Sequence, residues 1–289
     1  MNYLGHILVM ISIYAMLGGS LNLVAGYTGL PSTCHAAFYG LGAYSTTLLM
    51  MSAGLGFFSS LGVSIVVTGL LSLVIALPAL RLKGDYFVLA TLGFQIIVVA
   101  LFYNLTNFTG GPNGIPGIPI PRLLGFEFDS VFRYLVLSSI VSACGLFVLW
   151  LLINSPFGRL LRAVREDELA AASLGKNVPR LQTLAFAISA GMAAVPGALF
   201  AGYIRFIDPT TFTVMESIFI LSIVVIGGAG SFWGPIVGAA FMVILPEALR
   251  FLELPLAAAA NVRQITYGLL LVILMRFRPQ GMLGEYKFE

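Results

Sequence analysis

Long runs of apolar residues dominate the chain. From Met1 to Leu80 there is no Asp, Glu, Lys or Arg, a stretch about four times the roughly 20 apolar residues that an α-helix needs to cross a bilayer. The runs lack the strict alternation of apolar and polar positions that membrane β-strands show. Because a backbone in hydrocarbon must satisfy its own hydrogen bonds, the pattern predicts an all-α fold, a polytopic bundle of transmembrane helices.

The pattern divides the chain into nine apolar segments, of which at least eight are expected to span the membrane. Their bounds are Leu4–Gly26, Cys34–Gly54, Phe57–Leu80, Tyr86–Asn107, Val131–Ile153, Gln182–Phe206, Val214–Ala229, Pro235–Phe251 and Arg263–Met275. The two short segments on either side of Gly227–Gly234 are alternatively half-helices around a re-entrant turn. No basic region precedes the first segment, so we interpret it as a retained helix and not as a signal peptide.

The composition agrees with a membrane location. Hydrophobic residues make up 59% of the 289 residues and charged residues only 9%, against about 25% charged residues in soluble domains. The bilayer is therefore expected to be the main partner of the surface. We exclude a soluble enzyme, a nucleic-acid-binding protein and a protein with a single anchor, and we treat residues 1–289 as one transmembrane domain.

The basic residues predict the topology, because short loops rich in Lys and Arg stay in the cytoplasm. The loop 154–181 is strongly basic, and the C-terminal tail carries Arg276, Arg278 and Lys287, so both are placed in the cytoplasm. The loop 104–130 then lies outside. The N-terminus is expected outside if all nine segments span, and inside if one of the first three is re-entrant.

The external loop is rich in residues that form turns. Asn107–Pro121 contains four Pro and four Gly, a composition that favours successive turns over a helix. It is interpreted either as a folded lip that meets an extracytoplasmic partner or as a compact connector.

The inner loop is predicted to hold two short helices. Ser155-Pro156 supplies an N-cap and a Pro at the first helical position, and Gly175 supplies a C-terminal stop. Between these signals lie Arg159, Arg162 and Arg165 at helical spacing, then the acids Glu166, Asp167 and Glu168, then the small residues Ala170 and Ala171. The arginines are alternatively explained by lipid headgroup contact. The second helix is expected to present little side chain, which suits docking into a groove on another protein.

The sequence contains no pattern for a cofactor of its own. The only Gly-Lys pair, Gly175-Lys176, lacks the other residues of a phosphate-binding loop. His6 and His35 have no carboxylate or thiol at ligand spacing, so no metal site is predicted. Cys34 and Cys144 lie in apolar stretches and are interpreted as buried structural thiols.

A weakly polar set of intramembrane side chains is the candidate translocation pathway. Its members are Asn22, His35, Thr46, Thr91, Gln95 and Ser189. His35 is alternatively a packing residue, and Glu216 and Glu247 are explained by snorkelling or by pairing with nearby Arg. The absence of a proton-relay carboxylate argues against an ion-coupled carrier.

Small residues mark candidate hinge or packing positions. Gly230, Gly234 and Gly238 repeat at four-residue spacing, which allows close helix approach or a tight turn. Pro196, between two nearby glycines, predicts a kink. Ordinary membrane packing and motion during transport both account for these residues.

The chain resembles the LivM-type permease family of branched-chain amino-acid ABC importers over essentially its whole length. The motifs that carry the resemblance are Leu21–Gly29, His35–Tyr44, Asp85–Phe87, Leu89–Phe94, Thr109–Gly114, Ser155–Arg159, Ala163–Glu168, Gly227–Ser231 with Trp233–Pro235, and Arg278–Gly281. In this family the inner loop resembles the segment that seats in a groove of the cytoplasmic ATPase. Ala170, Ala171 and Gly175 fit that segment, but Leu169 stands where a Glu is usual and the acid lies one place earlier, at Glu168.

The resemblance implies the rest of the assembly. It implies a second, LivH-like permease subunit, two cytoplasmic ABC ATPases that hold ATP and Mg, and an extracytoplasmic substrate-binding protein in a bacterial inner membrane. The expected function is import of branched-chain amino acids by alternating access. The alternatives are an ABC permease for urea, other amino acids or small carboxylates, and, from another class, an autonomous secondary carrier or channel.

Overall fold

Among the residues that the structure describes, five helices are long and apolar enough to cross a membrane. They are α1 (Asn2–Ala25), α3 (Phe57–Ala79), α4 (Asp85–Asn104), α6 (Val131–Asn154) and α9 (Val178–Ile204). Three shorter apolar helices, α2 (His35–Ser52), α10 (Val214–Gly227) and α11 (Gly234–Arg250), pack among them. The computed structural model describes residues 2–82, 84–123, 126–250, 268, 269, 272, 276 and 280–284. The predicted all-α, polytopic fold is confirmed.

Eight of the nine predicted segments correspond to these helices, and the ninth, Arg263–Met275, lies outside the described residues except at 268, 269 and 272. The largest error is at α9, which begins at Val178 and not at Gln182. The Asn177 side chain caps the helix by accepting a hydrogen bond from the Arg180 amide at 3.1 Å. Hydropathy excluded this first turn because it carries a charged residue.

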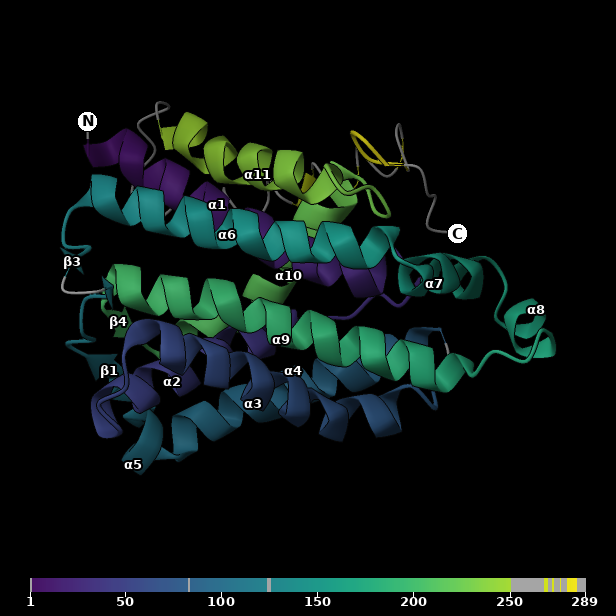
Figure 1. Ribbon diagram of the computed structural model, residues 1–289, viewed down its shortest axis with the longest axis horizontal. Coiled ribbons are helices and arrows are strands. Elements are labelled where there is room, and N and C mark those ends of the chain that lie inside the picture. Colours follow the sequence, from purple (N-terminus) through teal and green to yellow (C-terminus); the bar gives the residue numbers. More distant parts are fainter. Residues whose placement is uncertain are drawn as a thin grey trace.

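The bundle has two distinct ends (Figure 1). One end, here called the strand end, carries the start of α1 and the short strands, and the other, the α8 end, carries α7 (Pro156–Glu166) and α8 (Glu168–Ser173). The helices α1, α3 and α4 run from one end toward the other (Figure 1), and the start of α1 lies at the end opposite α7 and α8, as expected if all nine segments span. The helix α2 begins inside the bundle and is not among the five candidate spans, so the re-entrant alternative for one of the first three segments stays a prediction.

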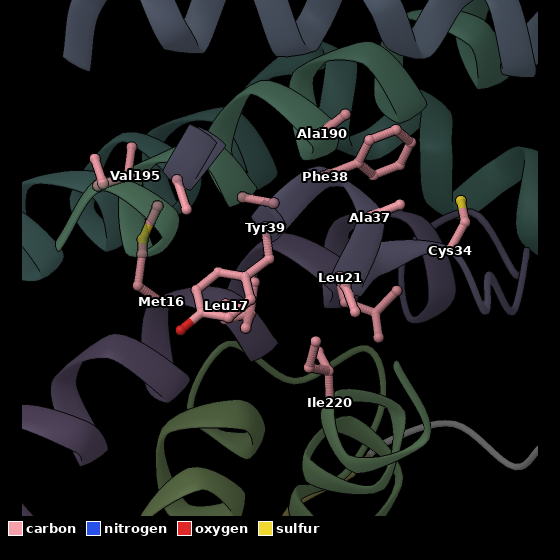
Figure 2. Packing of buried hydrophobic residues seen from close by; sticks show 14 of the residues in the cluster. Met16, Leu17, Leu21, Cys34, Ala37, Phe38, Tyr39, Ala190, Val195 and Ile220 are labelled. Carbon is pink, nitrogen blue, oxygen red and sulfur yellow. The ribbon is translucent and has the colours of Figure 1, made fainter. Parts of the chain in front are cut away.

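The central packing joins four helices that are far apart in the sequence. Figure 2 shows the side chains meeting there: Met16, Leu17 and Leu21 of α1, Ala37, Phe38 and Tyr39 of α2, Ala190 and Val195 of α9, and Ile220 of α10. Tyr39 is fully buried, and its ring lies 5.2 Å from that of Phe212. This core surrounds α2, which is why a helix dense in Gly, Ser and Thr lies inside the bundle and not against lipid.

The helices α2 and α9 cross almost backbone to backbone. A Cβ on Gly42 of α2 would lie 2.8 Å from the Ala194 Cβ, and one on Gly197 of α9 would lie 2.8 Å from the Ala43 nitrogen. Both positions require glycine, because small residues are what allow membrane helices to approach this closely. Pro196 lies inside α9 directly beside this crossing.

The helix α3 has one polar and one apolar face. Its hydroxyl side chains recur every four residues and are fully buried: Ser60, Ser64, Thr68 and Ser72. The opposite face is exposed and apolar, with Leu70, Val74 and Leu77 each at least 60% exposed. A helix whose polar groups turn inward and whose leucines turn outward is arranged for lipid, where the outer surface carries no penalty for being apolar.

The helices α10 and α11 form a hairpin. Their connecting turn lies at the α8 end, and α11 returns along α1 toward the strand end (Figure 1). There the Tyr3 hydroxyl donates to Glu247. With 14 and 17 residues, α10 and α11 are shorter than the five candidate spans, so the half-helix alternative for this pair stays a prediction. Gly234 and Gly238 lie against Gly227, where side chains would keep the two helices apart.

The strand end is covered by a folded loop. It contains α5 (Thr106–Thr109), the 3₁₀ turn η1 (Gly111–Asn113), β1 (Ile115–Pro116), β2 (Arg122–Leu123) and β3 (Phe126–Glu127), and after α9 follow β4 (Phe206–Ile207) and the 3₁₀ turn η2 (Pro209–Phe212). The strand β1 pairs antiparallel with β4, with Ile115 opposite Ile207. The turn-rich prediction agrees with this segment except for the single helical turn of α5. The pairing ties the loop to the end of α9.

Candidate functional site

The helix α7 leaves the membrane helix α6 through a defined cap. Ser155 Oγ accepts hydrogen bonds from the amides of Phe157 at 3.2 Å and Gly158 at 3.5 Å. The helix buries Leu161 and Val164 and leaves Arg159 exposed, so it is amphipathic and lies along the α8 end. The cap and the starting Pro are where the sequence predicted them.

Two of the three predicted arginines turn inward. Arg162 Nη2 donates to the Ile153 carbonyl at 3.0 Å, and its guanidinium lies 5.6 Å from the centre of the Tyr27 ring. Arg165 Nη1 donates to the Gly26 carbonyl at 2.8 Å, and the side chain is 11% exposed. The alternative of lipid headgroup contact does not account for Arg162 and Arg165, because both bind the chain's own backbone at the ends of α6 and α1.

The helix α8 is held by its own acids. Asp167 Oδ1 caps it by accepting from the amides of Leu169 at 2.8 Å and Ala170 at 2.9 Å. Glu168 Oε1 accepts from Gln182 Nε2 at 2.5 Å, which ties α8 to α9. Glu166 forms an ion pair with Arg165 at 2.6 Å. The predicted acids Glu166, Asp167 and Glu168 thus stabilise the loop through contacts within the chain.

The outward face of α8 differs from the predicted small face. Ala171 is buried in a cluster with Val164 and Val178, whereas Leu169 and Leu174 are each 78% exposed. Ala170 is exposed, and Gly175 ends the segment with a φ of +77°. Neither leucine was predicted to lie on the surface of the loop. Both could have been identified as candidates, because they are large apolar side chains in a charged loop outside the apolar segments.

The polar interior is centred on the start of α2, which begins inside the bundle. The Ala37 amide donates to Gln95 Oε1 at 2.8 Å, and the Ala36 amide donates to Ser217 Oγ at 3.0 Å. Gln95 Nε2 also donates to the Phe212 carbonyl at 2.6 Å. The first amides of a helix have no partner within it, so Gln95 of α4 and Ser217 of α10 supply the missing acceptors.

The other candidate pathway residues are also hydrogen-bonded within the chain. His35 Nε2 lies 2.8 Å from Ser20 Oγ, and Ser189 Oγ donates to the Ser20 carbonyl at 2.5 Å. Thr46 Oγ1 donates to Ser64 Oγ at 2.8 Å. Thr91 Oγ1 lies 3.1 Å from Thr33 Oγ1. The structure brings His35 and Ser189 together through Ser20, and it places Thr46 separately, against α3.

Asn22 occupies a different place from the rest of the pathway set. Its Nδ2 donates to the Ser231 carbonyl at 2.8 Å, and its Oδ1 accepts from the Gly230 amide at 2.9 Å. It is 2% exposed. Gly230 has a φ of +79°, a backbone conformation that favours glycine. Asn22 therefore holds the turn between α10 and α11.

Two cavities lie at the strand end, and none of the six candidate pathway residues lines either one. The first, of about 340 Å³, includes His6, Tyr203 and Arg205 in its wall. The second, of about 440 Å³, lies between the end of α2 and the loop segment near Pro119. His6 Nδ1 is 2.9 Å from the Tyr203 hydroxyl. All six candidate pathway residues are buried in the packed interior.

The intramembrane carboxylates pair with tyrosines of α1. The Tyr14 hydroxyl donates to Glu216 Oε1 at 2.8 Å, and Tyr3 donates to Glu247. At Glu216 the described partner is therefore a tyrosine and not an arginine, whereas snorkelling or arginine pairing at Glu247 stays a prediction. Cys34 is buried as predicted, but Cys144 is exposed on α6, so the prediction of a buried thiol is wrong there. Among the described residues, no group of three His, Cys, Asp or Glu side chains is placed to hold a metal ion.

These features define a multi-pass helical membrane protein with an ordered two-helix loop projecting from one end. The family described as the permease component of branched-chain amino acid transport systems matches residues 3–275. The chain belongs to this family. Its members are transport permeases, so the chain is a transport subunit and not an enzyme.

Three relatives illustrate the similarity. The chain is 39% identical to the high-affinity branched-chain amino acid transport system permease protein LivM of Salmonella typhimurium, over 96% of this chain and 69% of that protein. It is 38% identical to the LivM protein of Escherichia coli, over 94% and 68%. It is 26% identical to a probable LivM permease of Methanocaldococcus jannaschii, over 96% and 92%. The resemblance stated from the motifs is confirmed.

Proposed function

We propose that this chain is one permease subunit of an ATP-driven importer that moves branched-chain amino acids into the cytoplasm. This proposal is supported by the family match over residues 3–275 and by relatives that are named as permeases for these substrates. The membrane would be the inner membrane of a bacterium. ATP and Mg would be bound by separate ATPase subunits, which act on this chain through a contact.

The contact we propose is the loop formed by α7 and α8. It is anchored to the bundle by Arg162, Arg165 and Glu168, so a force applied to it reaches the membrane helices. Its exposed surface carries Leu169 and Leu174. A pair of protruding apolar side chains on an ordered helix is the type of feature that a groove on another protein buries. The α8 end would therefore face the cytoplasm.

The remaining partners follow from this orientation. The strand end would face outward, where the loop 104–130 is available to an extracytoplasmic binding protein. A second, LivH-like permease would complete the membrane part. The polar contacts at the start of α2, which involve His35, Thr91 and Gln95, would rearrange if α2 moves against α4 and α10 during alternating access. In this way the buried residues would take part in the pathway when the helices move.

The proposal is tested in bacterial cells that lack their own branched-chain amino acid uptake. The chain is expressed with its sister permease, ATPases and binding protein, and uptake of labelled leucine is measured. We expect uptake that disappears when the phosphate-loop lysine of the ATPases is replaced by alanine. Uptake that persists in this variant points to a secondary carrier, and uptake of urea or a small carboxylate in place of leucine refutes the substrate.

A further inference from the structure

A continuous set of contacts connects α7 to the turn between α10 and α11. It starts at Arg165 in the last turn of α7, whose Nη1 donates to the Gly26 carbonyl at 2.8 Å. Gly26 follows directly after α1 and lies against Gly230, with no space between them for a side chain. One turn earlier on α1, Asn22 holds Gly230 and Ser231 by two hydrogen bonds.

The turn is closed from its other side by residues near the C-terminus. The Met282 amide donates to the Ile226 carbonyl at 2.8 Å, and the Leu283 amide donates to the Gly227 carbonyl at 2.9 Å. These bonds satisfy carbonyls that the last turn of α10 leaves without partners. The turn is therefore held on both sides, and it cannot shift without breaking the bonds to Asn22 or those to Met282 and Leu283.

The helix α10 connects this turn to the polar interior. It contains 14 residues, which corresponds to about 21 Å at the rise of an α-helix. Near its other end, Ser217 accepts from the Ala36 amide and donates to Gln95 at 3.2 Å. A displacement of the turn along the axis of α10 would therefore reach the start of α2.

We propose that Arg165 and Asn22 are positioning residues that transmit movement of the α7–α8 loop to α10 and the start of α2. This inference rests on the proposed function, because it assigns the movement to ATP hydrolysis by the partner. Both side chains are well buried. Their partners are backbone atoms, so replacing Arg165 or Asn22 removes the contact and leaves the partner atom in place. Adjacency alone does not demonstrate coupling, so the test measures the coupling itself.

The variants remove defined contacts. Asn22→Ala removes both bonds to the turn, and Asn22→Asp retains the acceptor for Gly230 but loses the donor to Ser231. Arg165→Met removes the bond to Gly26 together with the ion pair to Glu166, and Arg165→Lys retains the positive charge. The matched controls are Asn154→Ala, an exposed asparagine at the same end of the bundle, and Arg180→Met, an exposed arginine in the same loop.

The first measurement is leucine imported per ATP hydrolysed by the complete transporter in proteoliposomes. We expect Asn22→Ala and Arg165→Met to lower this ratio at least tenfold while ATPase binding changes less than twofold. Asn22→Asp and Arg165→Lys should retain more of the ratio. The double variant should fall no further than the more severe single variant, because both changes break the same connection. Ratios equal to wild type in both single variants overturn the inference.

The second measurement does not require transport. Hydrogen exchange at the amides of residues 228–231 is followed with and without the ATPases. We expect ATPase binding to change the exchange rate at least threefold in the wild-type chain and not in Arg165→Met. If wild-type exchange does not respond, the inference is wrong even where transport occurs. If both Asn22 variants fail to assemble, the residue acts in folding and its transmission role is refuted. Failure of the proposed function is recognised separately, by a wild-type complex without ATP-driven leucine import.

Discussion

Two outward leucines, Leu169 in α8 and Leu174 directly after it, locate the proposed ATPase contact most sharply. Leu169 and Leu174 are each 78% exposed, and neither belongs to the buried cluster formed by Val164, Ala171 and Val178. Replacing both by alanine therefore removes surface that only a partner can bury. Alanine also favours helix formation, so α8 is expected to remain folded in the double variant Leu169→Ala/Leu174→Ala.

The size of the effect follows from the area that the partner would cover. Full burial of a leucine side chain contributes about 1.5–3 kcal/mol, and truncation to alanine loses most of this, about 1–2 kcal/mol for each residue. Both changes together then cost about 2–4 kcal/mol. Since about 1.4 kcal/mol corresponds to a tenfold change in affinity, binding of the ATPase is expected to weaken roughly 30- to 700-fold.

The assay is titration of the ATPase onto the purified permease pair in nanodiscs, with the dissociation constant as the result. The matched control is Leu184→Ala, because Leu184 is also exposed, at 44%, but lies on α9 outside the loop. We expect the control to bind within twofold of wild type. A double variant that also binds within twofold of wild type would refute the assignment of α8 as the contact.

Three further predictions concern the bundle itself. Gly197→Leu places a side chain against the backbone of α2 and is expected to lower the free energy of unfolding by at least the roughly 1–3 kcal/mol typical of overpacking. Thermal unfolding in detergent should therefore show a clear loss of stability. The control Gly62→Leu should be neutral, because no atom lies within 4 Å of a Cβ at that position. Tyr14→Phe removes the hydroxyl that donates to Glu216 and should cost about 1–3 kcal/mol, while Tyr3→Phe at the partly exposed Glu247 should cost less in the same assay. In the isolated subunit, a lipid-soluble maleimide should label Cys144 but not the buried Cys34, and labelling of Cys34 at an equal rate would contradict the packing around α2.

Local signals predicted most of the fold. The apolar segment Val131–Ile153 matches α6 to within one residue, because hydropathy and helix length are both local properties of the chain. The Ser155 cap and the stop at Gly175 were also predictable, since each depends on residues within one turn. Errors at helix ends arose where a cap lies outside the apolar run, as at Asn177 before α9.

The roles of individual site residues depended on contacts between distant segments, and these the sequence pattern does not contain. Arg165 is spaced like a residue that faces lipid headgroups, yet it binds Gly26, which is 139 positions away. Ala171 matches the family's coupling segment but is buried, and the exposed Leu169 stands where that segment usually has Glu. The departure from the family pattern at Leu169 therefore indicated which residue lies on the outward surface of α8.

We propose that ATP hydrolysis by partner subunits drives leucine inward through this chain. The most direct measurement is accumulation of labelled leucine in proteoliposomes that contain the complete transporter, with binding protein on one side and ATP on the side of α7 and α8. We expect accumulation above the external concentration with ATP, and none with a proton or sodium gradient alone. Accumulation driven by either ion gradient without ATP would contradict it.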